Sequence, residues 1–524
     1  STNNISQDTT SPDTTYQSKA VAFVDSTNKD FHLAPTDTAA KDAGAELSAD
    51  TSLTLGMTGG VDIDGQKRGS LATSSAGGLG WDIGADEGAT IMYRSVGNDT
   101  SNLNTGGATV TIASSTATFN VALPNNVGVG DVLQYGNSLT LAFITGRSSS
   151  TVYSIVNATG TYPVATTSAS ASIYRAHTLL NNWQTQTTGT VNQSINAGLR
   201  PLVLVARNLV ASNTAMFVPA YASTSPDSTI VNINNWTTGA GNNIKIYTPV
   251  SASEVGITQR HAGKWDDNKY RIQITNGGDL FQVSEEFVTI DGIQIKAISS
   301  GGGYPRVIRK NFNSLDSNFI VSNNIIAGEF TSLTNYGTGF ADYWLDQGVV
   351  KIYNNIIYGF TGGGSIDSGI GISGGLSYIY NNTFYNNERA IYSYGSATSS
   401  IKNNIAQNCT GVCYAIDADS GSSNNIASDN TAPGSAPKNS TVVNFLNTAA
   451  SSTYDFHLAP TDRAARDSGV SLASDPYLPF TIDIDGNARP QGPAWDIGAD
   501  EDAASNPDYR FNGWFKLKGF YKFR

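Results

Sequence analysis

Two pairs of aspartates are the residues best suited to holding a cation. Each pair stands in the motif Asp-Ile-Asp-Gly, and the four residues are Asp62, Asp64, Asp483 and Asp485. Hard cations such as Ca²⁺ prefer several oxygen ligands, and Asp-x-Asp-Gly forms part of many calcium loops. An EF-hand would also need a glutamate about seven residues after the second aspartate, where Leu71 and Gly492 stand instead. The motif therefore predicts a candidate calcium site that is not an EF-hand.

Further acids follow each pair and could complete such a site. They are Asp82, Asp86 and Glu87 after the first pair, and Asp496, Asp500 and Glu501 after the second. The alternative is that all these acids accept hydrogen bonds in turns and pair with Arg68 and Arg489. Both interpretations stay open, and calcium is the one cofactor that the sequence suggests.

Scattered acids in the middle of the chain raise the question of catalysis. Cleavage of a polysaccharide needs two carboxyl groups about 5–9.5 Å apart, or a base beside a charge-neutralising group. The candidate charged groups are Asp342, Asp346, Asp367, Glu388, Arg389, Asp417 and Asp419. Tyr343 and Trp344 could stack on a sugar ring, whereas His32 and His457 belong to a repeated motif and are predicted to be structural. Because these groups form no recognisable catalytic set, we predict no catalytic residues; a polysaccharide-binding or polysaccharide-cleaving protein is the alternative.

The last fifteen residues, RFNGWFKLKGFYKFR, form an amphipathic cationic strand. Their repeat of six residues preserves the alternation of faces along a strand. A strand of this kind is an aggregation hazard unless a partner covers it. We predict that it docks on a neighbouring copy of the chain; packing on its own chain or anchoring to an anionic envelope surface are the alternatives. The residues assigned to this contact are Phe511, Trp514, Phe515, Lys516, Leu517, Lys518, Phe520, Tyr521, Lys522, Phe523 and Arg524.

The two cysteines of the chain, Cys409 and Cys413, lie in the segment NCTGVC. Two thiolates alone do not make a structural zinc site, which takes four ligands. In a chain rich in Ser, Thr and Asn, the pair favours a small disulfide loop in an exported protein. Two buried free thiols are the alternative.

Composition indicates which elements must position these residues. Charged residues make up 14% of the 524 residues, below the usual ~25%. Ser, Thr, Asn and Gly, which form helices poorly, take their place and favour short strands joined by turns. The net charge of −12 disfavours nucleic acid as a partner. The sequence contains no apolar run of about 18 residues, so it predicts no transmembrane segment.

A long-range repeat joins the two ends of the chain. The motif DFHLAPTD with its following residues at 30–44 returns at 455–469, and WDIGADE at 81–87 returns at 495–501. The block that opens the chain, residues 1–87, is therefore a second copy of a block near its end. A subunit that begins and ends with the same module suits head-to-tail addition.

A shorter periodicity runs through the middle of the chain. Asn-Asn pairs follow short β-branched strands, and their first members are Asn323, Asn354, Asn381, Asn403 and Asn424. Spacings of 21–31 residues fit one turn of a parallel β-helix, in which three strands and three bends make a coil. Stacked coils would bring the asparagines into register, where their amides can form a ladder. The pattern predicts about eleven coils over residues 200–445; an antiparallel sandwich with regular Asn-Gly hairpins is the alternative.

The repeated motifs at the two ends carry a resemblance. DFHL…AP…DAG, DIDG and W-DIGA-E resemble the terminal module of secreted bacterial right-handed parallel β-helix proteins of the "choice-of-anchor" type. The resemblance implies a right-handed β-helix, an extracellular location and attachment to the cell surface. In that family the module occurs once, near the C-terminus, whereas here it also opens the chain.

The sequence thus predicts an all-β protein with a right-handed parallel β-helix, a small antiparallel β domain where apolar and polar residues alternate between Gly and Asn turns, and a duplicated terminal module. The expected parts are a first end module (1–90), the antiparallel domain (91–177), the parallel β-helix (178–421), the last coils with a second end module (422–502) and the C-terminal strand (503–524). The predicted function is that of an extracellular structural rod that assembles head-to-tail with copies of itself, with the cell envelope or a polysaccharide as alternative partners.

Overall fold

The regular structure of the chain is almost entirely β. The computed structural model describes residues 4–26, 30–34, 36–41, 43–44, 83–84, 88–136, 140–300, 304–312, 314, 318–330, 337–342, 348–362, 367–395 and 397–502. The helices in these ranges are α1 (Leu180–Thr185) and the 3₁₀ turns η1 (Thr14–Tyr16), η2 (Arg200–Leu202) and η3 (Ser451–Thr453). None of these described helices is long and apolar enough to cross a membrane.

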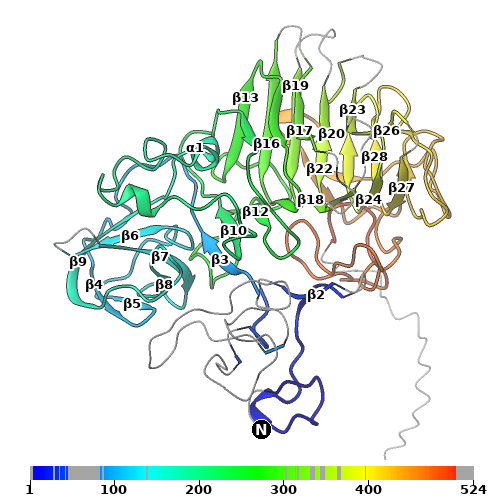
Figure 1. The fold of residues 1–524 in the computed structure, drawn as a ribbon. Helices are drawn as coiled ribbons and strands as arrows, with labels where there is room; N and C mark the ends of the chain where they lie inside the picture. Colours follow the sequence, from blue (N-terminus) through cyan, green and yellow to red (C-terminus); the bar gives the residue numbers. More distant parts are fainter. Residues whose placement is uncertain are drawn as a thin grey trace, which may run out of the picture.

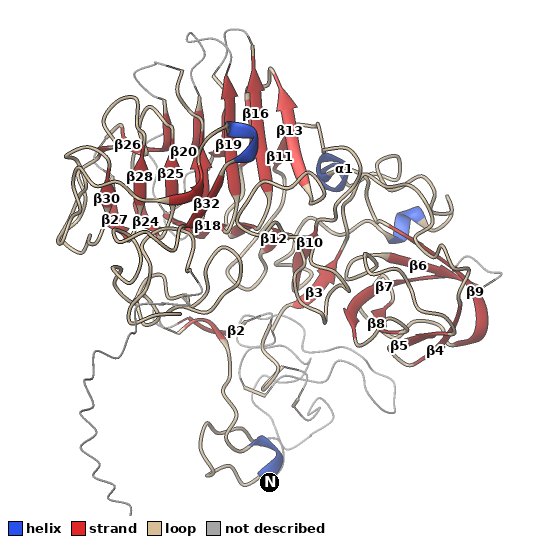
Figure 2. Cartoon of the chain, turned by 180° about the vertical axis from the view of Figure 1, so that it is seen from behind, coloured by secondary structure: helices blue, strands red, loops and turns tan. Residues whose placement is uncertain are grey.

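Three parallel sheets form the body of the molecule (Figures 1 and 2). Sheet 1 consists of β3 (Thr90–Tyr93), β10 (Thr214–Pro219), β12 (Ile244–Tyr247), β15 (Val288–Asp291), β18 (Asn318–Ser322), β21 (Val349–Tyr353), β24 (Leu376–Tyr380) and β27 (Thr398–Lys402). Sheet 2 consists of β13 (Arg271–Thr275), β16 (Gln294–Ser299), β19 (Ile325–Phe330), β22 (Ile356–Tyr358), β25 (Thr383–Tyr385), β28 (Ile405–Gln407) and β30 (Ile426–Ala427). Sheet 3 consists of β11 (Val231–Ile233), β14 (Asp279–Val283), β17 (Arg306–Lys310), β20 (Thr338–Asp342), β23 (Ser368–Ile372), β26 (Ile391–Ser393) and β29 (Tyr414–Ala415).

The chain visits the three sheets in turn, so that β15, β16 and β17 make one coil and β18, β19 and β20 make the next. Each strand pairs in parallel with the strand one coil away; Ile290 of β15, for example, lies opposite Val321 of β18. The predicted right-handed parallel β-helix is confirmed. Among the described residues six coils, from β12–β14 to β27–β29, contribute to all three sheets. The prediction of eleven was too high, because loops such as residues 248–270 lengthen the coils.

Apolar side chains that alternate along each strand fill the interior of the β-helix. One coil buries Ile290, Ile295 and Ile308, and the next buries Val321, Ile326 and Phe340. Successive side chains of a strand point to opposite faces, so one set per coil faces inward. Each fully buried aliphatic or aromatic side chain contributes about 1.5–3 kcal/mol. Stacking of such sets, coil on coil, makes one continuous core.

The Asn pairs form the corner between sheet 1 and sheet 2. The first asparagine of each pair has a φ of 50–56°, in the left-handed region that a sharp bend needs. The second asparagine is buried and forms the ladder. The backbone N–H and the Nδ2 of Asn355 both donate to Oδ1 of Asn382, each at 3.0 Å. Equivalent bonds connect the whole set of Asn324, Asn355, Asn382, Asn404 and Asn425.

A closed antiparallel barrel is inserted in the first turn of the rod. It consists of β4 (Thr109–Ala113), β5 (Thr116–Phe119), β6 (Val132–Tyr135), β7 (Thr140–Arg147), β8 (Val152–Val156) and β9 (Thr166–Tyr174). The strands on either side of it, β3 and β10, pair with each other, so the rod begins at β3 instead of near residue 178. After the barrel, α1 packs Leu180 and Trp183 into the core at this end of the rod.

The second end module folds back along the outside of the rod (Figure 1). Residues 422–442 complete the last turn, with β30 in sheet 2. The rest, including the antiparallel pair β31 (Phe445–Asn447) and β32 (Asp455–Leu458), lies against the corner of Asn pairs. Nδ2 of Asn381 donates to the backbone carbonyls of Asp496 (3.0 Å) and Gly498 (2.9 Å). The first asparagines from Asn354 onward thus both make the bend and bond the backbone of the second end module.

Candidate functional site

The acids considered for catalysis do not form a site among the described residues. Asp342 is buried and pairs with Lys310 at 3.6 Å, and buried Asp367 accepts a hydrogen bond from the backbone of Gly337 at 2.7 Å. Asp419 accepts bonds from Gly421 and Ser422 within its own turn. Each of these acids therefore has a local structural role.

The remaining candidates of that group do not change this result. Glu388 accepts a hydrogen bond from Thr410 and lies 4.0 Å from Arg389, while Asp417 is exposed. Asp346, Tyr343 and Trp344 lie outside the described residues. The same holds for the whole predicted assembly strand, residues 503–524, and for Asp62, Asp64, Asp82, Asp86 and Glu87 of the first end module.

Cys409 and Cys413 form a disulfide next to the last complete coil. Cys413 is fully buried and belongs to the main core, and Cys409 packs against it. A disulfide of this kind forms in an oxidising compartment.

In the part of the first end module that the structure describes, a hairpin and the turn after it have the same local fold as in the second. In the first, β1 (Phe23–Asp25) pairs with β2 (Asp30–Leu33); in the second, β31 pairs with β32 in the same register. One aspartate caps the turn that follows. Asp37 accepts bonds from the N–H groups of Ala22, Ala39, Ala40 and Lys41, and Asp462 accepts from those of Asn444, Ala464, Ala465 and Arg466. The repeated sequence therefore gives a repeated structure.

The two modules differ in what covers their aromatic residues. Phe23 and Phe31 stack edge-on at 5.5 Å, just as Phe445 and Phe456 do at 5.4 Å. Phe456 is only 2% exposed, because its ring also packs on the rings of Tyr358 (5.4 Å) and Tyr385 (5.1 Å) of sheet 2. Its counterpart Phe31 is 58% exposed. Within the described part of the first end module, Phe31 is thus exposed where its counterpart Phe456 packs on the β-helix.

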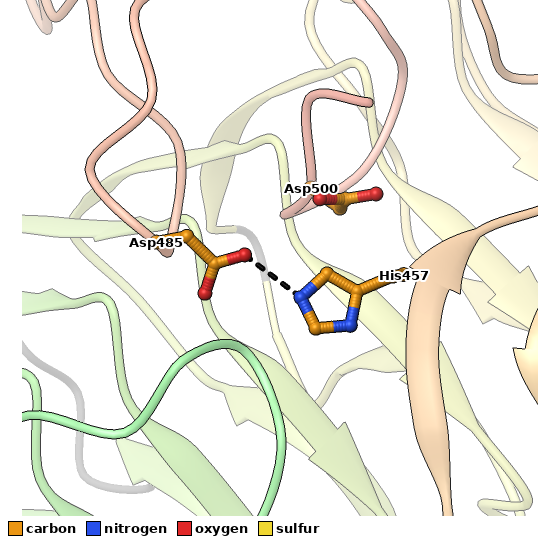
Figure 3. Close-up of side chains that lie close together, drawn as sticks. All are labelled: His457, Asp485 and Asp500. Carbon is orange, nitrogen blue, oxygen red and sulfur yellow. Dashed lines mark hydrogen bonds and ion pairs between the residues drawn. The ribbon is translucent and has the colours of Figure 1, made fainter. Parts of the chain in front are cut away.

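The second end module gathers one histidine and several carboxylates (Figure 3). His457, on β32, donates from Nε2 to Oδ2 of Asp485 at 2.8 Å, and its Nδ1 bonds Asp455. Asp500 lies above the ring in the close-up, and its Oδ2 accepts the N–H of Leu458 at 2.7 Å. One ligand atom from each of His457, Asp485 and Asp500 lies within 4.8 Å of the others.

Burial and charge work against each other in this cluster. Burial disfavours the charged imidazolium, but the hydrogen bond that His457 donates to Asp485 and the negative charges of Asp500 and Asp485 outweigh it and raise the pKa of His457 to about 10. Burial raises the pKa of Asp500 to about 7. Burial together with the charge of Glu501 raises the pKa of Asp496 to about 7. Perturbed groups of this kind mark candidate functional sites, although structural ion-pair networks produce them too.

The Asp-Ile-Asp-Gly motif divides its two aspartates between different roles. Oδ1 of Asp483 accepts the N–H groups of Asp485 and Asn487, and Oδ2 accepts Nδ2 of Asn487 and the N–H of Glu501. Four hydrogen bonds occupy Asp483, so it stabilises the turn. Only Asp485 of this pair belongs to the histidine cluster. The acids that follow the motif also have different roles. Asp500 belongs to the histidine cluster, whereas Glu501 pairs with buried Arg489 at 3.0 Å.

The sequence predicts a structural role for His457 and does not place it among the candidate ligands. The signal that connects it to the acids is the repeat itself. Asp455, His457, Asp485 and Asp500 each have an identical residue at the equivalent position of the first end module, namely Asp30, His32, Asp64 and Asp86.

A hollow of about 260 Å³ lies where sheet 2 meets the second end module. Aromatic and polar side chains line it together, among them Lys296, Glu329, Phe330, Tyr358, Asn386 and Tyr454. Lys296 and Glu329 form an ion pair at 3.6 Å across neighbouring coils. Aromatic rings beside hydrogen-bonding groups are suited to binding a small polar ligand.

No protein-family model and no curated protein matches the chain. Among solved structures, the crystal structure of pectate lyase Pel9A shares 12% identity with it, over 55% of this chain and 88% of that chain, with a TM-score of 0.23. A likeness at this level carries no argument about activity. The assignment of a parallel β-helix rests on the three parallel sheets themselves.

Proposed function

We propose that this chain is an extracellular structural protein whose β-helix rods join head-to-tail, the first end module of one subunit docking on the rod of a neighbour. The observation that carries the proposal is the contrast between two copies of one module. Phe456 is buried against a β-helix flank and Phe31 is 58% exposed, although the hairpins around them match. The disulfide supports an oxidising, extracellular location.

The first end module is proposed to dock on the same side of the rod, here called the flank, on which the second end module packs. That flank consists of outward-facing apolar residues of sheet 2 and the first asparagines of the corner. In a neighbouring subunit the second end module already occupies it, so docking is an exchange of one module for its copy. Exchange of equivalent elements between subunits is domain swapping, and a head-to-tail swap that does not close produces a filament. The cationic strand 503–524, proposed to dock on the same neighbour, would add to this contact.

A matched pair of substitutions tests the exchange. Phe31→Ala should abolish oligomers while leaving the melting temperature unchanged, because an exposed side chain contributes little to folding. Phe456→Ala should destabilise the second end module by about 3–5 kcal/mol and, by freeing the flank, should increase oligomer formation. Sedimentation velocity over a range of protein concentrations measures the assembly, and calorimetry measures the stability.

The two variants also control for each other. A loss of oligomers in both would indicate a general folding defect. Concentration-independent monomers in the wild type, or fibres that persist in the Phe31→Ala variant, would contradict docking by the first end module. Removing residues 508–524 and measuring particle length by electron microscopy separates the contribution of the C-terminal strand; unchanged fibres would exclude it.

The second candidate function is polysaccharide binding, which the hollow beside Tyr454 favours. Its aromatic rings could stack on sugars, and Lys296 could pair with a uronic acid. Calorimetric titration with neutral and with acidic oligosaccharides would test polysaccharide binding. The Tyr454→Ala variant should bind about two- to tenfold more weakly if the hollow is the site, since a stacked ring contributes roughly 0.5–1.5 kcal/mol.

A further inference from the structure

We propose that the second end module binds a divalent cation of the zinc class through Nε2 of His457 and one carboxylate oxygen each from Asp485 and Asp500. This inference is independent of the proposed assembly, because the ligands come from the module itself and not from a neighbouring subunit. The proposed metal is of the zinc class, whereas the sequence suggested calcium, and the proposed set of ligands is also different.

The donor atoms already lie close to the positions that a metal requires. The three ligand atoms are within 4.8 Å of one another. A zinc ion bound at about 2.0–2.2 Å to nitrogen and oxygen holds its ligands roughly 3.4 Å apart, so small side-chain movements complete the site. On binding, the proton between Nε2 of His457 and Oδ2 of Asp485 leaves to solvent, and the nitrogen lone pair takes the metal. A fourth position stays open for water.

One oxygen of the cluster has no protein partner. Oδ1 of Asp485 is buried and accepts no hydrogen bond in the described structure. An orphaned carboxylate oxygen is costly to bury, and a bound cation removes that cost. The unpartnered atom is therefore an independent indication of a missing ligand.

Gly263, in the loop of residues 248–270, packs closely against this oxygen and the imidazole of His457. Gly263 has a φ of +60°, and a Cβ at this position would stand 2.6 Å from Nε2 of His457 and 2.8 Å from Oδ1 of Asp485. A side chain there would therefore fill the space between two of the proposed ligands. Glycine keeps that space clear.

The residues around the ligands orient them as supporting residues of a metal site do. Asp455 bonds Nδ1 of His457, which directs Nε2 toward the other ligands. Metal-bound histidines regularly carry such a carboxylate on the second nitrogen. The N–H of Leu458 holds one oxygen of Asp500 at 2.7 Å, and Lys264 lies 3.4 Å from Asp455. The first of these contacts restrains a ligand directly, and the second balances the charge of the orienting carboxylate.

The donor set favours zinc over calcium. Calcium takes six to eight oxygen ligands, whereas imidazole with two carboxylates suits zinc and related ions. Asp483, which the sequence paired with Asp485 as a calcium ligand, has its oxygens occupied by four hydrogen bonds. The first end module carries all four equivalent residues, Asp30, His32, Asp64 and Asp86; the last two lie outside the described residues.

Calorimetric titration of the chelator-treated full chain with zinc chloride tests the proposal. We expect the wild type to bind at least one zinc ion per chain. His457→Gln and Asp500→Asn should each bind one zinc ion fewer, or bind that ion at least about tenfold more weakly. The control Asp417→Asn changes an exposed acid outside the cluster and should bind as the wild type does. Calcium chloride in excess should not displace the zinc.

X-ray absorption of the zinc-loaded wild type keeps the proposal testable even where a variant folds poorly. It should show a shell of nitrogen and oxygen that includes imidazole. Circular dichroism and melting of each metal-free variant report whether it is folded. Absence of stoichiometric zinc, unchanged binding in both folded variants, displacement by calcium or a zinc shell without imidazole would overturn the assignment.

Discussion

At the scale of single residues, the corner asparagines show what sequence patterns can and cannot specify. The Asn-Asn pairs predicted both a sharp bend and a ladder, and both are present. The sequence could not predict which asparagine of a pair makes the bend and which joins the ladder, because this depends on where each strand ends relative to the bend. The first residue takes the left-handed conformation, as Asn381 does with a φ of 50°, and this turns the second, Asn382, into the interior.

The ladder predicts a large effect of one substitution. Asn382→Ala removes the acceptor of the N–H of Asn355 and the amide donor to the carbonyls of Ile352 and Tyr380, all in the core. We expect the free energy of unfolding to fall by about 2–4 kcal/mol. Asn408→Gly is the matched control, since Asn408 also has a positive φ but an exposed side chain, and should change stability by less than about 1 kcal/mol. Urea denaturation measures both; equal effects would show that the ladder is not what stabilises the corner.

His261 predicts a pH dependence of stability. Burial, together with the positive charges of Arg260 and Lys269, lowers its pKa to about 3, against smaller opposing effects of the hydrogen bond to the Asn323 carbonyl and the charge of Asp291. The unfolded histidine takes up a proton near pH 6.5 and the folded one does not. Between about pH 6.5 and 3 the folded state therefore loses up to about 1.4 kcal/mol per pH unit as the pH falls.

The His261→Gln variant removes this contribution. On acidification from pH 7 to pH 5, the wild type should lose about 2 kcal/mol more stability than the variant does. Urea denaturation at the two pH values measures the difference between the slopes, so a uniform loss of stability in the variant does not matter. Parallel slopes would contradict a neutral buried imidazole.

At the scale of elements, the strands could be predicted and the placement of the second end module could not. The segment of β22 reads Ile356-Ile357-Tyr358, and all three residues are buried. Ile357 faces the interior, while Ile356 and Tyr358 lie under the second end module. A continuous apolar run indicates that both faces of a strand are covered. The run does not indicate which segment covers the strand, because that segment lies about a hundred residues further along the chain.

Arg489 is the residue on which the packing of that module depends most clearly. Its guanidinium is fully buried, donates to Glu501 at 3.0 Å and bonds the carbonyls of Gly498 and Ala499. Arg489→Lys keeps the charge but loses the fork of donors. We expect a loss of about 3 kcal/mol, or roughly a hundredfold faster hydrogen exchange in residues 443–502, with the rod unaffected. Arg200→Lys, in the 3₁₀ turn η2, is the control, since this guanidinium bonds Gln193 and Ile195; equal exchange in both variants would refute the assigned role.

At the scale of the whole molecule, composition predicted an all-β chain and the repeats predicted a rod with duplicated ends. What the repeats could not show is that the second end module packs on the side of the rod. The second end module is held there by its own chain, at high effective concentration, so exchange between subunits should need a high protein concentration or a crowded surface. Assembly is therefore expected to rise steeply with concentration, which sedimentation measures.

A disulfide trap tests the docking most directly. The ring centroids of Phe456 and Tyr385 are 5.1 Å apart. Because Phe31 is the counterpart of Phe456, docking should place Phe31 beside Tyr385 of a neighbouring subunit. The double variant Phe31→Cys/Tyr385→Cys should then form a ladder of covalent oligomers on a non-reducing gel, whereas Phe456→Cys/Tyr385→Cys should form an internal bridge and stay monomeric. A double variant that oxidises only to monomers, at concentrations where the wild type assembles, would contradict the account.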